Sequence, residues 1–283
     1  MSKLKVIYIA SNGRSGSTLL QMLLNLHKNI FTVGELQELP NELKKNGICG
    51  CKRKISLCKF WQKVLKSGRI NLSEVNYFRK KSGSGKVLRF FFLYKIFFKK
   101  KINTNFYINQ NLILFRKIYS NISPSKKMIV DSSKDPYRLY YFLCSNKFEV
   151  YPIHIKKKPQ AFVYSMSKKN QNNLYKIIRL SIKYLIENYI IRSVCKIYSK
   201  KFIEISYEEL AKTPTKVVNN ILKNLELKKI NSHEIKNFRS KFNHAISGNE
   251  MKFRNDKIKY DNKWEKNMPF LNKLIVSIFN FNT

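Results

Sequence analysis

The sequence has 283 residues, of which 43% are hydrophobic and 13% aromatic, and this excludes a disordered chain and allows one large core. Lys and Arg number 56 against 17 Asp and Glu, a net charge of +39. These basic residues are spread along the chain rather than gathered in one arm. We therefore attribute most of the charge to overall composition, with a nucleic-acid or membrane-surface binder kept as an alternative.

Five short apolar, β-branched runs predict strands, and helical patterns separate them: 5–10, 30–33, 127–131, 148–155 and 202–206. Such alternation implies crossover connections and a parallel sheet with helices on both faces. The sequence therefore predicts a three-layer α/β/α fold in a single domain over 1–283, with a helical insertion at about 40–125. The first strand begins almost at once, so we expect no secretory leader and a cytoplasmic protein.

The segment after the first strand has the layout of a phosphate-binding loop, which makes the predicted fold P-loop-type. Its glycines let the backbone approach an anion, and the N–H groups at the start of the following helix point at negative charge. Ser17 stands where a nucleoside-triphosphate loop carries its lysine. The alternative is a plain Gly-Ser turn before a helix. The candidate anion-binding residues are Asn12, Gly13, Arg14, Ser15, Gly16, Ser17 and Thr18.

Polar residues also follow the other predicted strands, and ligands of an open parallel sheet bind beyond the carboxyl ends of its strands. These positions include Glu35, Lys134, Lys157 and Tyr207, with Ser165 in the helix that Pro159 opens. A later turn carries Gly248, Asn249 and Lys252. For the segments around Lys134 and Lys157, the alternatives are a helix cap and a basic surface turn.

Three of the five cysteines, Cys49, Cys51 and Cys58, lie close together in the sequence, and Cys144 and Cys195 are expected in the core. A structural zinc site needs four ligands. Only three thiols gather here, and the nearest upstream histidine is His27. The sequence therefore predicts no metal, and it leaves a local disulfide or simple packing open.

An aromatic and basic run covers residues 88–101. We expect a helix with a buried aromatic face, and a helix on a membrane surface is the alternative. Basic residues interrupt the run, and no stretch of the chain reaches the ~20 apolar residues of a membrane span.

Four of these stretches resemble sulfotransferases that use 3′-phosphoadenosine-5′-phosphosulfate (PAPS): NGRSGSTLL, DSSKDPYRL, HIKKKPQAFVYS and ISGNEMKF. With VGEL, CxC…CxFW and YEEL, they are similar to the branch related to carbohydrate and tyrosyl-protein sulfotransferases. The resemblance runs from about residue 5 to 265. The usual Arg-Asp-Pro-Arg of the 3′-phosphate motif is replaced by Lys157, Lys158, Pro159 and Gln160, so a point charge stands in place of a guanidinium fork.

The resemblance implies an enzyme that moves a sulfuryl group from PAPS to an acceptor hydroxyl, most simply on a carbohydrate. It would release 3′-phosphoadenosine-5′-phosphate (PAP), and its reaction would need no metal. The first loop would hold the 5′-phosphosulfate, with Arg14 and Lys134 adding charge. Lys157, Ser165 and Lys252 would bind the 3′-phosphate, and Tyr207 would touch the adenine. Glu35 would be the base, and the alternative is that it pairs with a basic neighbour. His27 and His154 are weaker candidates, because their apolar contexts favour core positions. The competing functions are a P-loop kinase or NTPase and a non-enzymatic basic binder.

Overall fold

The computed structural model describes residues 3–66, 68, 70–76, 93–94, 97–98, 105–168, 171–241, 243–254 and 256–280. The helix expected over 88–101 lies largely outside these residues. None of the described helices combines the length and the apolarity that a bilayer-spanning segment needs.

A five-stranded parallel sheet with the order β2-β3-β1-β4-β5 forms the centre of the molecule. Each predicted strand is present, with its bounds within three residues of the expectation. Strand β1 is central: Val6 pairs with Ile129 of β3 on one side and with Val150 of β4 on the other. The strands are β1 (Leu4–Ser11), β2 (Ile30–Gly34), β3 (Met128–Lys134), β4 (Phe148–Lys156) and β5 (Ile203–Ser206).

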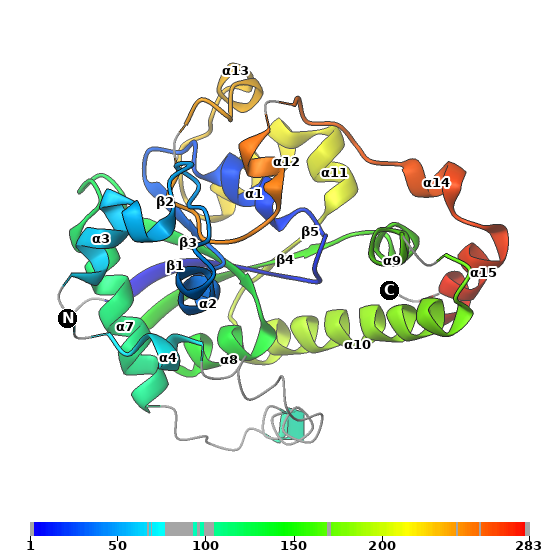
Figure 1. Ribbon diagram of the computed structural model, residues 1–283, viewed down its shortest axis with the longest axis horizontal. Helices are drawn as coiled ribbons and strands as arrows, with labels where there is room; N and C mark the ends of the chain where they lie inside the picture. Colours follow the sequence, from blue (N-terminus) through cyan, green and yellow to red (C-terminus); the bar gives the residue numbers. More distant parts are fainter. Residues whose placement is uncertain are drawn as a thin grey trace.

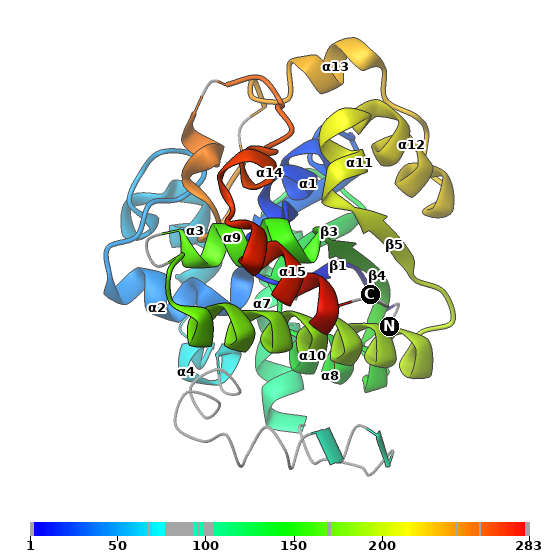
Figure 2. The ribbon, with the colours of Figure 1, turned by 90° about the vertical axis from the view of Figure 1, so that its right-hand side faces the viewer.

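Helices cover both faces of the sheet, which confirms the predicted three-layer α/β fold (Figure 1). Successive side chains of β1 point to opposite faces, so this one strand supplies two cores. Ile7 and Ile9 pack with α1 (Ser17–Leu24) and α12 (Pro214–Asn224). Val6 and Tyr8 pack on the other face with α7 (Asn105–Ser120), α8 (Pro136–Cys144) and α10 (Leu174–Tyr198). Figure 2 shows the same division from the side.

Helical apolar spacing at 19–27 and 176–200, and Pro214 at the start of an apolar pattern at about 214–225, predict three helices, and these are present as α1, α10 and α12. Helix α1 starts at Ser17, earlier than the apolar spacing indicates, because the left-handed Gly16 (φ 87°) turns the chain directly into it. The remaining helices are α2 (Leu39–Lys44), α3 (Lys59–Leu65), α4 (Leu72–Val75), α9 (Pro159–Ser167), α11 (Tyr207–Lys212), α13 (Ser232–Lys236), α14 (Lys263–Asn267) and α15 (Phe270–Phe279), with short 3₁₀ turns η1 (Leu36–Glu38), η2 (Ile55–Leu57) and η3 (Glu250–Phe253).

The segment between β2 and β3 carries the helices α2, α3, α4 and α7, with a turn and an isolated β-bridge between Ile48 and Lys54, and it packs onto the sheet. Trp61 of α3 and Phe115 of α7 are fully buried in the same apolar cluster as Val6 and Tyr8. The segment therefore shares the core of the sheet.

The two isolated cysteines differ in burial. Cys195 is buried as expected, but the expectation of a core position for Cys144 is wrong, because this residue ends α8 and is exposed.

Candidate functional site

The loop 12–18 leaves β1 and enters α1 with its polar groups turned inward. Asn12, Ser15, Ser17 and Thr18 are buried, whereas Arg14 is exposed and has a left-handed backbone (φ 65°). The Ser15 hydroxyl and the side-chain Oδ1 of Asn12 are buried, and neither has a hydrogen-bond partner among the residues that the structure describes. Buried polar atoms are normally paired, so these two atoms fit a loop that contacts a polar ligand.

Tyr207, at the end of β5, packs directly on the loop. A Cβ atom at Gly16 would lie 2.5 Å from Cδ2 of Tyr207, so the Tyr207 ring can occupy this position only because residue 16 has no side chain. The Lys157 ammonium lies 4.7 Å from the centre of the same ring. The structure therefore brings together three residues that the sequence predicts from three separate strand ends.

Lys157 is a buried cation whose charge is only partly offset by nearby carboxylates. Its side chain is 7% exposed, and within the described parts of the chain its ammonium forms no ion pair. Burial lowers the pKa of Lys157, with Asp261 and Glu208 acting in the opposite direction. A buried ammonium of this kind is stabilised when an anionic ligand arrives.

Glu35 and Lys134, which follow β2 and β3, form an ion pair through Glu35 Oε1 and Lys134 Nζ. The two side chains are 10% and 20% exposed. Lys134 has a left-handed backbone (φ 67°), an uncommon conformation for a lysine and one that often marks a functional position.

A segment from the C-terminal part of the chain holds Glu35 in place. The Glu35 N–H donates to the Ile246 carbonyl at 2.9 Å, and the Ile246 N–H donates to the Val33 carbonyl at 2.8 Å. A Cβ atom at Gly34 would lie 2.3 Å from the Ile246 carbonyl oxygen, so this close approach depends on the glycine.

The predicted turn at Gly248 and Asn249 contacts the loop. The Asn249 N–H donates to Thr18 Oγ1 at 3.1 Å. The Lys252 ammonium donates to the Ser247 carbonyl at 2.6 Å and lies 3.4 Å and 3.5 Å from the carbonyls of Ile48 and Ala245. In this structure it therefore holds the turn together, and its expected contact with a phosphate stays a prediction. So does that of Ser165, which is half-buried in α9.

The two histidines kept as weaker base candidates are both buried and hydrogen-bonded within the fold. His154 is fully buried, with Nδ1 3.2 Å from Glu204 Oε2 and Nε2 3.0 Å from Asn188 Oδ1. The hydrogen bond from His154 lowers the pKa of Glu204 to about 2. His27 is buried and its Nδ1 accepts the Asn29 N–H.

One residue that contacts the loop was not predicted from the sequence. Glu187, in the middle of α10, accepts a hydrogen bond from Asn12 Nδ2 at 2.7 Å. Nothing around residue 187 in the sequence signals this contact, because the two residues meet only when α10 packs across the sheet.

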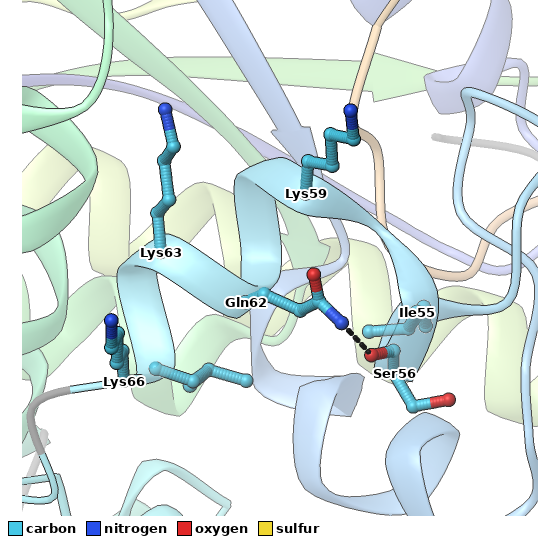
Figure 3. Close-up of a pocket in the computed structure, with 7 residues that line it drawn as sticks. Ile55, Ser56, Lys59, Gln62, Lys63 and Lys66 are labelled. Atoms are coloured by element: carbon cyan, nitrogen blue, oxygen red, sulfur yellow. Dashed lines mark hydrogen bonds between the residues drawn. The ribbon is translucent and has the colours of Figure 1, made fainter.

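A hollow of about 640 Å³ lies elsewhere, on the insertion (Figure 3). Lys59 and Lys63 project in the same direction from α3, and Gln62 donates to the Ser56 carbonyl at its edge. No residue from the strand ends lines this hollow, so it is separate from the site described above.

Neither a protein-family model nor a curated protein matches the sequence. Two solved structures match over nearly the whole chain. The sulfotransferase domain of the Synechococcus PCC 7002 olefin synthase has a TM-score of 0.58 at 18% identity, covering 100% of this chain and 96% of its own. The chain has a sulfotransferase fold. The sulfotransferase domain from the curacin biosynthetic pathway also has a TM-score of 0.58, at 15% identity, with 98% of both chains covered. The sulfotransferase fold implied by the sequence motifs is thus confirmed, and these identities specify no branch of sulfotransferases.

Proposed function

We propose that the protein is a sulfotransferase that uses PAPS and moves its sulfuryl group to an acceptor hydroxyl, most simply on a carbohydrate. One observation carries the proposal: the loop 12–18, the Glu35–Lys134 pair and the buried Lys157 all lie at the same edge of the sheet. A sulfotransferase fold at this TM-score supports it.

The residues present fit a nucleotide with phosphate groups at both ends. The loop offers an exposed Arg14 fork and the Ser15 hydroxyl, which has no partner within the described part of the chain. Lys157 offers a buried ammonium beside the Tyr207 ring, which is a surface for an adenine. We assign the loop, with Ser17 and Thr18, to the 5′ end, and Lys157 with Ser165 to the 3′-phosphate.

PAPS supplies an activated sulfuryl group, and the chain supplies the charges around it. Glu35 would accept the proton of the acceptor hydroxyl as that oxygen bonds to sulfur, while the bond from sulfur to the 5′-phosphate oxygen breaks and PAP leaves. Lys134 and Arg14 stabilise the negative charge that grows on the leaving side. A carboxylate and a cation that lie in contact beside the loop support this assignment of roles.

A P-loop kinase is the competing function for the same loop. It normally needs a loop lysine, and Ser17 occupies that position, while the cation nearest to Glu35 comes from β3. The buried Lys157 beyond β4 is explained by a second phosphate at the far end of the nucleotide.

Labelled PAPS tests the activity directly. The purified protein is incubated with ³⁵S-PAPS and a panel of glycans and hydroxylated aliphatic acids, the latter because one similar structure belongs to an olefin synthase. We expect label in one acceptor and release of PAP. In parallel, PAP should raise the melting temperature, and ATP with Mg²⁺ should not. Stabilisation by ATP with Mg²⁺ alone would favour the kinase.

A further inference from the structure

The three clustered cysteines meet a histidine from the other end of the chain. The Sγ of Cys58 lies 3.3 Å from Nδ1 of His244, and the Sγ of Cys49 lies 3.8 Å from the same nitrogen. The Sγ atoms of Cys51 and Cys58 are 3.6 Å apart. All four ligand atoms lie within 4.8 Å of one another.

These spacings match the edges of a tetrahedral zinc site. Zn–S bonds of about 2.3 Å and Zn–N bonds of about 2.0–2.1 Å place two sulfurs ~3.8 Å apart and a sulfur and a nitrogen ~3.6 Å apart. Three thiols and one imidazole complete a closed four-ligand set of the structural type. We propose that Cys49, Cys51, Cys58 and His244 bind one structural Zn²⁺.

The chain holds the four ligands in position through other contacts. A tight turn places Cys49 and Cys51 side by side: the Cys49 N–H donates to the Arg53 carbonyl, and the Lys52 N–H donates to the Cys49 carbonyl. The His244 ring stacks on Phe60 with 4.7 Å between ring centres, and Trp61 Nε1 donates to the His244 carbonyl at 2.9 Å. These contacts orient the imidazole toward the thiols.

A metal explains the cluster better than a disulfide does. All three cysteines are free in the structure, and a disulfide between any two would leave the third thiol and His244 without a role. The Zn²⁺ site with three thiolates carries a net negative charge. The exposed Lys52, Arg53 and Lys54 follow Cys51 directly and offset that charge.

The position of the cluster suggests what the zinc stabilises. His244 lies two residues before Ile246, whose backbone pairs with Val33 and Glu35. The Gly50 N–H donates to the Ala245 carbonyl at 3.0 Å, next to the cluster. Zinc would therefore tie the insertion to the segment that holds the end of β2.

The first test measures metal in the purified full-length protein, prepared under reducing conditions with zinc present and desalted before elemental analysis. We expect about one zinc ion per chain, as in closed structural sites. Co²⁺ exchanged into the protein should give the intense visible bands of a tetrahedral thiolate complex. A wild-type protein that holds no zinc and gives no such spectrum would overturn the proposal, whatever its activity.

The second test uses variants with matched controls. Cys58→Ser and His244→Gln should lose the zinc, whereas Cys195→Ser and Cys144→Ser, which lie outside the cluster, should retain it. Equal loss of zinc in the control variants would contradict the assignment.

If the site variants do not fold, the wild-type protein tests the proposal through alkylation of its cysteines. Three cysteines should resist modification until a chelator is added, and a Cys51–Cys58 disulfide found by mass spectrometry would replace the zinc site.

Discussion

The Glu35 carboxylate and the Lys134 ammonium are in contact, at the end of two neighbouring strands, and both side chains are largely buried. A glutamate in such a setting can serve as a base or as a partner that orients the lysine. Removal of the Glu35 charge distinguishes the two roles. A base is needed for turnover but not for nucleotide binding, so its loss lowers the rate and leaves nucleotide affinity unchanged.

We therefore expect Glu35→Gln to lower kcat by ~10²–10⁴-fold, the usual contribution of a general base. The substitution keeps the size of the side chain, so affinity for PAP should change little. The control is Glu209→Gln, on the exposed first turn of α11. Kinetics with a working acceptor and calorimetry with PAP measure the two effects. Near-normal turnover would remove Glu35 from the proposed role.

Lys157 and Lys158 form a natural pair for testing the 3′-phosphate site. Lys157 is buried against Tyr207, whereas Lys158 is exposed. A hydrogen bond to a charged group contributes about 1.5–3 kcal/mol, so Lys157→Ala should weaken PAP binding by roughly 10- to 100-fold. Lys158→Ala should leave it nearly unchanged. Equal effects of the two variants in calorimetry would show that only general charge matters.

At the scale of elements, a buried ion pair joins β3 to α8, and hydrogen bonds from the same arginine reach the insertion. The guanidinium of Arg138 in α8 lies 2.9 Å from the Asp131 carboxylate of β3, and its Nη1 donates to the Tyr107 hydroxyl and to the side-chain Oδ1 of Asn111 in α7. Asp131 also accepts from the Ser133 hydroxyl. The pair thus stabilises the short segment that leads from Asp131 to Lys134.

Removing one partner of this pair should be costly. Arg138→Ala leaves the Asp131 carboxylate buried and unpaired, which costs about 3–5 kcal/mol of unfolding free energy. The control is Arg192→Ala, because the Arg192 side chain is 52% exposed and its contact with Glu204 is a surface pair, worth about 0–1 kcal/mol. Urea unfolding measures both. A loss under about 1 kcal/mol for Arg138→Ala would show that water reaches the pair.

The strands were predictable from sequence because each is a short β-branched run that ends in polar residues. Residues placed next to the strand ends, such as Glu35 and Lys134, could be predicted together because parallel strands end at one edge. His244 as the neighbour of Cys58 could not, because 186 positions separate them and no local pattern marks the histidine. The contact of Glu187 with Asn12 was missed for the same reason.

At the scale of the whole molecule, the net charge of +39 makes a general attraction for polyanions unavoidable. This attraction differs from a nucleotide site in its dependence on salt. Non-specific binding of duplex DNA releases counterions, so its affinity falls by roughly 10³-fold or more between about 50 and 200 mM salt when several phosphates are contacted. A small ligand held by a few buried and oriented groups is screened less.

We therefore expect PAP affinity to fall by less than about tenfold over that range of salt, while affinity for duplex DNA falls much more steeply. Lys157→Ala should weaken PAP binding and leave DNA binding unchanged, because one buried lysine contributes little to the field of 56 basic residues. Calorimetry for PAP and fluorescence anisotropy for DNA, both against salt, make the comparison. The proposed nucleotide site would be contradicted if salt weakened the binding of PAP and DNA to the same degree and Lys157→Ala changed neither affinity. The residues at the strand ends would then be only one part of a general basic surface.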